Sequence, residues 1–212
     1  MPSTAQVAQQ SKFYVSGTPG SAITITGITK ATQAVVTATN TLAVGDVVTF
    51  GAVTGMPEIN GLLGIVKVAT SPSFTVAIDS SGFATAGTSG TATPQTFTKV
   101  GNVKDFTPDG GTSNVIDVTN LDSTAKEKRQ GLQDNGNISL NYDVDDTDAG
   151  QLALIASRTA QSVSVFRIAY PGGLKIRAFS GFVQKISEPN AGPDKVLSSA
   201  ATIVITGAIA RG

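Results

Sequence analysis

Four carboxylates lie within residues 143–148, and they are the residues best placed to do chemistry. Oxygen ligands at this density are typical of a Ca²⁺ loop. The spacing does not fit an EF-hand, because position twelve counted from Asp143 is Leu154, where that loop carries a bidentate glutamate. Acidic residues that end a strand can instead cap the next helix and stabilise its positive N-terminus. We therefore expect helix capping here, and no metal or other cofactor.

The same carboxylates could form a glycosidase pair with Glu188 or Asp194, since two suitably spaced carboxyl groups can catalyse that reaction. Sugar sites usually also have aromatic platforms, whereas this chain has no tryptophan and three tyrosines. It has no cysteine or histidine either, which excludes thiol catalysis, Cys or His metal sites, and Ser-His or Cys-His triads. The sequence thus predicts a protein that is not an enzyme.

A dense run of charges occupies residues 120–135, directly after a predicted strand at 115–119. Loops longer than about 12–15 residues are usually functional or disordered. An ordinary solvated loop and a contact surface are both compatible with the run, but mixed charges flanked by Leu121 and Leu132 suit a loop lying on a neighbouring subunit. The residues of this candidate inter-subunit loop are Asn120, Leu121, Asp122, Ser123, Lys126, Glu127, Lys128, Arg129 and Gln130.

The elements that must position these residues are mainly strands. Alternating or apolar runs bounded by turn residues predict strands at residues 97–106, 115–119, 137–144, 162–170, 174–187 and 200–209. Asn135-Gly136 and Pro171-Gly-Gly173 lie between such runs and are typical of tight hairpin turns, so we expect antiparallel pairing.

One short helix is predicted over residues 147–158, between the third and fourth of these strands. Its apolar spacing places Leu152, Ile155 and Ala156 on one face, which we expect to lie on the sheet. An Asp or Thr at its start is suited to the N-cap position.

Charge density divides the chain. Residues 22–95 carry five charged side chains, whereas residues 96–212 carry twenty-four. The low-charge part has short strand-like runs at 34–39, 47–50, 63–68 and 74–78, separated by turn signals, which predict a small all-β barrel or sandwich. Its Gly/Ser/Thr-rich end at 80–94 suits a linker or a flexible return strand.

A further strand candidate at residues 11–16 precedes the low-charge part and cannot form a domain alone. We expect it to pair with the second part, because insertions are tolerated at exposed turns. The preferred layout is one core domain of residues 1–21 and 96–212, interrupted by a small β domain of residues 22–95. Two sequential domains with a disordered N-terminal arm are the alternative. The predicted fold class is mainly β: an antiparallel β-sandwich or barrel with one short helix, plus the inserted all-β domain.

Fifteen basic and fifteen acidic residues give a formal net charge of zero, which disfavours a surface that holds nucleic acid. The N-terminal residues lack the features of a signal peptide, and no apolar run approaches the roughly 20 residues of a membrane span. We expect a protein that stays in the cytosol, without a membrane partner.

Three motifs carry a resemblance to a family: Val118-Thr-Asn-Leu-Asp-Ser-Thr-Ala-Lys-Glu-Lys128, then Gly131-Leu-Gln-Asp-Asn-Gly-Asn-Ile-Ser139, then Tyr142-Asp and Asp148-Ala-Gly-Gln-Leu152. In this order they resemble the major tail tube proteins of long-tailed bacteriophages. The likeness covers the N-terminal strand and residues 96–212. Residues 22–95 resemble a separate small β module that recurs as an insertion in phage structural proteins.

The resemblance implies a structural virion protein that polymerises as stacked hexameric rings into the tail tube, the conduit for DNA ejection. Its partners would be further copies of itself, other tail proteins such as tape measure, terminator and baseplate components, and the DNA that passes through a neutral or acidic lumen. The N-terminal residues would be an arm that orders on assembly, which would take place in the host cytoplasm. The alternative is a monomeric β-rich module that binds a surface or decorates a capsid.

Overall fold

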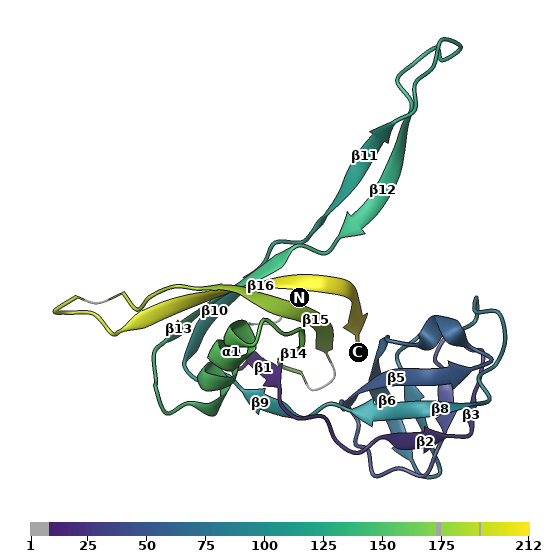
Figure 1. Cartoon of the computed structure of the whole chain (residues 1–212), viewed down its shortest axis with the longest axis horizontal. Helices are drawn as coiled ribbons and strands as arrows, with labels where there is room; N and C mark the ends of the chain where they lie inside the picture. Colours follow the sequence, from purple (N-terminus) through teal and green to yellow (C-terminus); the bar gives the residue numbers. More distant parts are fainter. Residues whose placement is uncertain (1–8, 173–174, 191) are drawn as a thin grey trace, which may run out of the picture.

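The computed structural model describes residues 9–172, 175–190 and 192–212. The prediction of a mainly β fold with one short α-helix is confirmed, because the strands form antiparallel sheets and the described residues contain a single α-helix (Figure 1). Two sheets have seven strands each, and a third has two. Residues 1–8 of the expected N-terminal arm lie outside the described residues.

The first seven-stranded sheet, called the body sheet, combines the start of the chain with its second half. Its strands are β1 (Lys12–Ser16), β9 (Phe97–Lys99), β10 (Val103–Pro108), β13 (Asn137–Asp143), β14 (Ser164–Ala169), β15 (Ile176–Ile186) and β16 (Ser198–Arg211). They are arranged in the order β10-β13-β16-β15-β14-β1-β9, so that β1 lies between β14 and the edge strand β9. A strand near the N-terminus therefore completes a sheet built otherwise from residues after 96.

The body sheet curls around its own core. Phe13 on β1 and Phe106 on β10 belong to strands near opposite edges, yet their ring centroids are 6.3 Å apart. Phe166 extends this aromatic group and stacks on Phe179 with a centroid separation of 5.6 Å. Fourteen buried residues form the core, and all come from residues before 16 or after 99. The body thus has a hydrophobic core of its own.

The second seven-stranded sheet is built wholly from residues 23–94. Its strands are β2 (Ile23–Ile25), β3 (Gly27–Ile28), β4 (Val35–Thr37), β5 (Val47–Thr54), β6 (Leu63–Thr70), β7 (Ser73–Val76) and β8 (Ser89–Pro94), with a short 3₁₀ helix, η1 (Pro57–Ile59). They follow the order β2-β8-β5-β6-β7-β4-β3 around a separate core that includes Phe50, Phe74 and Met56. Of the two alternatives expected for residues 80–94, the structure has the return strand and not the linker, since β8 pairs with both β2 and β5.

The two sheets meet through a small third core. Val47, Leu63 and Ile65 of the second sheet bury Ala178 of β15, with Ile176 packed against the cluster. This contact covers part of the body sheet and holds the two parts together by apolar burial.

Helix α1 (Ala149–Thr159) has Asp148 as its N-cap, one of the two residue types predicted there, since the Asp148 Oδ1 accepts a hydrogen bond from the Gln151 amide at 2.8 Å. The predicted inward face is wrong. Leu152, Ile155 and Ala156 are exposed, whereas Gly150, Gln151, Leu154 and Ser157 are the buried residues. The cause is the close approach of the helix to β9, where a Cβ on Gly150 would collide with the carbonyl oxygen of Lys99.

A single strand over residues 97–106 is also not observed. The run divides into β9 and β10, which lie at opposite edges of the body sheet. Asn102 has a left-handed φ of 55°, and the Gly101 amide donates to Asp148 Oδ1 at 3.1 Å. A left-handed residue cannot continue an extended strand, so the chain turns beneath the start of α1.

Gly150→Ala is expected to destabilise the body. The new methyl would meet the backbone of Lys99 and Val100, including Val100 Cα at 2.5 Å, and backbone cannot move aside as a flexible side chain can. Overpacking of this kind costs about 1–3 kcal/mol, which exceeds the helix-propensity gain of about 1 kcal/mol. Denaturant unfolding monitored by circular dichroism measures the change. Gly82→Ala is the matched control, because its methyl would meet nothing within 4 Å; equal stabilities for the two variants would contradict the expectation.

Candidate assembly surfaces

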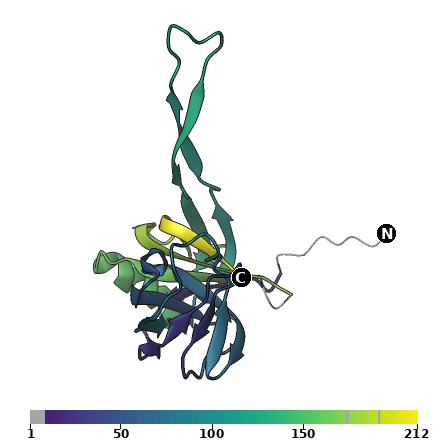
Figure 2. The ribbon, with the colours of Figure 1, turned by 90° about the vertical axis from the view of Figure 1, so that its right-hand side faces the viewer.

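A two-stranded hairpin projects from the body. It consists of β11 (Thr112–Asp117), β12 (Lys128–Asp134) and the loop of residues 118–127 that joins them, and this whole segment is called the arm. Figures 1 and 2 show it standing clear of both larger sheets. β11 and β12 pair only with each other. The predicted loop at 120–135 is therefore partly wrong, because β12 lies inside it.

The base of the arm is a kink between two stretches of one hairpin. β10 pairs with β13 and β11 with β12, while three glycines with positive φ (Gly110, Gly111 and Gly136) interrupt the ladder. A Cβ on Gly111 would collide with the Asp134 carbonyl oxygen. Asn135-Gly136 is thus not the hairpin turn predicted from the sequence, since it connects strands of two different sheets. Gly172, by contrast, follows β14 in the predicted β14–β15 hairpin.

The tip of the arm is held by local hydrogen bonds. Asn120 Oδ1 accepts from the Asp122 amide at 2.9 Å, and the Asn120 amide donates to Ser123 Oγ at 3.2 Å. The Val118 amide donates to the Glu127 carbonyl at 3.0 Å, so the strands remain joined up to the loop. Hydrogen bonds from Thr119 lower the pKa of Asp117 below its ordinary value, which keeps this carboxylate charged.

The arm exposes large apolar side chains along its length. Leu121 at the tip is 105% exposed and Leu132 on β12 is 92% exposed. Three more exposed apolar residues are Val115 and Ile116 on β11 and Val118, the first residue of the loop. All nine residues of the candidate inter-subunit loop lie here, six in the loop and Lys128, Arg129 and Gln130 on β12. Exposed large apolar side chains gathered on one projecting segment are typical of contact surfaces.

The β11 side chains belong to this surface but were not among the predicted site residues. Val115 lies opposite Gln130, and Ile116 lies opposite Arg129. In the sequence these residues appear as an apolar run in a predicted strand, and such residues are normally expected to be buried in a core. The structure shows that these residues face outward, because no other element of the described residues covers them.

The acidic cluster at residues 143–148 serves local structure. Asp148 caps α1, and Asp145 Oδ1 accepts from the Thr147 amide at 2.9 Å and from its hydroxyl at 2.6 Å. These hydrogen bonds lower the Asp145 pKa. Asp143 forms an ion pair with Lys104 at 2.6 Å. Within residues 9–172, 175–190 and 192–212, no three Asp, Glu, His or Cys side chains are grouped so as to hold a metal ion.

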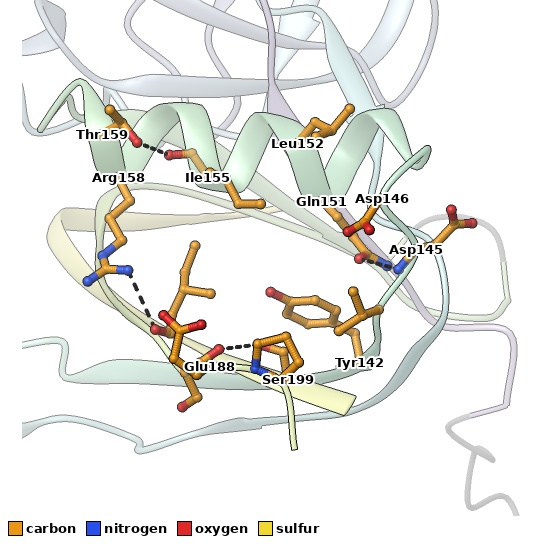
Figure 3. A pocket seen from close by; sticks show the side chains of 14 residues that line it. Tyr142, Asp145, Asp146, Gln151, Leu152, Ile155, Arg158, Thr159, Glu188 and Ser199 are labelled. Carbon is orange, nitrogen blue, oxygen red and sulfur yellow. Dashed lines mark hydrogen bonds between the residues drawn. The ribbon is translucent and has the colours of Figure 1, made fainter. Parts of the chain in front are cut away.

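A cavity of about 420 Å³ lies beside α1 (Figure 3). It is lined by α1, by the end of β13, by the last residue of β15 and by residues 187–189, which follow it. Glu188, Asp145 and Asp146 all line it, so the structure brings Glu188 near two of the acidic residues considered as a glycosidase pair. Asp194 is not among the lining residues.

These features define a β-rich structural protein with an exposed arm. The family described as phage tail tube protein, TTP, matches residues 54–211, which include the arm, the helix and most of the body sheet. The chain belongs to this family. It is therefore a structural protein of the virion tail and not an enzyme, as the sequence predicted. A comparison with curated proteins found no match.

The helices within the described part of the chain are too short or too polar to cross a membrane.

Proposed function

We propose that this protein polymerises as stacked hexameric rings into the tail tube through which DNA leaves the capsid. Membership of the tail tube family supports self-assembly and contacts with other tail proteins. The observation that carries the proposal is the arm, whose five large apolar side chains have no cover within the described chain. An isolated subunit gains nothing from such a surface, whereas a neighbouring copy would bury it.

The arm is the proposed bridge to an adjacent subunit or ring. Its tip combines Leu121 with a mixed set of charges, and charge pairs across an interface fix register more than they add affinity. The proposed inter-subunit residues remain those nine between Asn120 and Gln130. Closing body sheets across subunits would also cover the edge strands β9 and β10, which an isolated sheet leaves open.

The proposed domain layout is a core of residues 1–21 and 96–212 with an inserted β domain of residues 22–95. Two features support it: the separate hydrophobic core of the second sheet, and the pairing of Ser16 on β1 with Phe97 on β9. The chain thus leaves the body sheet and returns to it at neighbouring positions. An inserted domain of this kind would lie at the outside of the tube.

Further proposed partners are tape measure, terminator and baseplate proteins, with assembly in the host cytoplasm and DNA passing through a neutral or acidic lumen. The formal net charge of zero is compatible with such a lumen, because a strongly basic wall would hold DNA in place.

Negative-stain electron microscopy of the concentrated protein, alone and with other tail proteins, tests the proposal. Rings with sixfold symmetry that stack into hollow tubes are the expected result. Particles that stay monomeric under both conditions would overturn it.

A further inference from the structure

Helix α1 buries Leu154 in the body core but presents its other two large apolar side chains to solvent. Leu152 is 49% exposed and Ile155 is 47% exposed, whereas Gln151 is buried against the body. The Gln151 amide group is fully used there: its Nε2 donates to the Asp143 and Gly101 carbonyls, and its Oε1 accepts from the Asp145 amide. A surface helix normally has the opposite arrangement, with its apolar stripe toward the core. The outer face of α1 is therefore a surface without its covering partner in the described chain.

Leu152 and Ile155 line the cavity of about 420 Å³ described above (Figure 3). Ile186, Pro189 and Tyr142 supply further apolar lining. Binding pockets of about 300–1,000 Å³ are typical of sites that enclose small apolar groups with a few polar contacts. The cavity thus has the size and lining to receive one apolar side chain and its neighbours from another molecule.

The charges around the cavity are predominantly negative. Asp145, Asp146 and Glu188 line it together with a single cation, Arg158. Arg158 is already engaged with the cavity wall, since its Nη1 donates to the Ile186 carbonyl at 3.5 Å. An apolar group that enters here is favoured when it is flanked by basic residues, because complementary charges steer and orient association.

The arm tip carries the complementary features. Leu121 is fully exposed, and between residues 120 and 130 basic residues outnumber acidic ones three to two. The basic residues are Lys126, Lys128 and Arg129, the acidic ones Asp122 and Glu127. Figures 1 and 2 show the arm projecting away from α1, so its tip does not lie at the cavity of its own chain.

We propose that the cavity beside α1 receives the arm tip of a neighbouring copy, with Leu121 entering beside Leu152 and Ile155. Lys126 and Arg129 then face Asp146 and Glu188. This inference rests on the proposed self-assembly and adds the receiving surface to it. It also accounts for the outward apolar face of α1 and the exposed leucine at the tip with a single contact.

Site-specific cross-linking tests the contact, because the chain has no cysteine and introduced thiols are the only ones present. The protein carrying Leu121→Cys and Ile155→Cys is assembled and treated with a short bismaleimide. Each copy then has one donor and one acceptor, so a denaturing gel should show a ladder of covalent multimers. Both replaced side chains are exposed, so folding should be retained.

Leu121→Cys combined with Val68→Cys is the matched control, since Val68 is 50% exposed but lies on β6 of the second sheet. It should give no ladder. The contact is overturned if tubes form normally but the protein with cysteines at 121 and 155 gives no ladder. It is also overturned if both cysteine pairs give equal ladders. In either case the proposed function stands. Failure of the unmodified protein to form tubes overturns both.

Charge exchange is an independent measurement. Asp146→Lys with Glu188→Lys should lower tube yield about tenfold, as should Lys126→Glu with Arg129→Glu, since juxtaposed like charges cost more than one factor of ten in association. Combining all four should restore the yield to within about threefold of the original, because opposite charges then face each other again. Asp194→Lys, outside the cavity lining, should have little effect. No recovery in the combined variant would overturn the proposed pairing.

Discussion

Excision of the arm should abolish tube formation while leaving the body folded. The change replaces residues 110–136 with Asn-Gly. The Asp109 amide already donates to the Asn137 carbonyl at 2.9 Å, so the ends are in register for a two-residue turn. None of the three hydrophobic cores contains a residue of the excised segment. We therefore expect the free energy of unfolding to change by no more than about 1 kcal/mol, as for changes away from a core.

Tube yield by electron microscopy and unfolding by circular dichroism together measure this result. A matched variant keeps β11 and β12 and changes only Leu121→Ser and Leu132→Ser; it should weaken assembly with no loss of fold, since both side chains are exposed. Removing only residues 121–130 is a poorer test, because it also deletes Lys128–Gln130 of β12, which pair with Val115–Asp117 of β11. Tubes of normal length and yield from the excised protein would show that the arm has no part in stacking.

Removal of residues 22–95, with the ends rejoined by a short Gly-Ser link, should leave a folded body. The connections run side by side: the Gly17 amide donates to the Thr96 carbonyl at 3.0 Å and the Gly20 amide to the Pro94 carbonyl at 2.8 Å. The main body core contains no residue of the removed segment. The free energy of unfolding should fall because the small core shared between the sheets is lost. That core is equivalent to one or two buried side chains at about 1.5–3 kcal/mol each.

Denaturant unfolding should therefore remain cooperative with a lower midpoint, and tubes should still form if the inserted domain lies outside them. Ile176→Thr with Phe97→Thr in the shortened protein is a useful companion, since both residues border the uncovered patch. These changes should improve solubility without restoring stability. A shortened protein that aggregates even with both changes, and with longer links, would show that residues 22–95 complete the body.

The sequence predicted many local features because the residues responsible lie close together in the chain. Asp148 caps α1 through an amide three residues away, which an Asp before an apolar stretch indicates directly. The strands at 137–144 and 162–170 correspond to β13 and β14 within two residues at each end. Strand β12 has charged residues and a glycine instead of an alternating pattern, so it could not be recognised. Its ladder depends on β11, which supplies the backbone partners.

By itself, the sequence determined the mainly β composition, the capped helix, the absence of cysteine and histidine chemistry, and the likeness to tail tube proteins. The tertiary structure alone decided which side chains face outward. Apolar spacing placed Leu152 and Ile155 in the core, but the close contact of Gly150 with β9 turned them toward solvent. The tertiary structure also decided the exposure of the apolar side chains on the arm. In the sequence they look like core residues, and only the fold shows that no second layer packs on the arm within the described residues. Periodicity records which residues share a face, whereas packing between distant strands determines what covers that face.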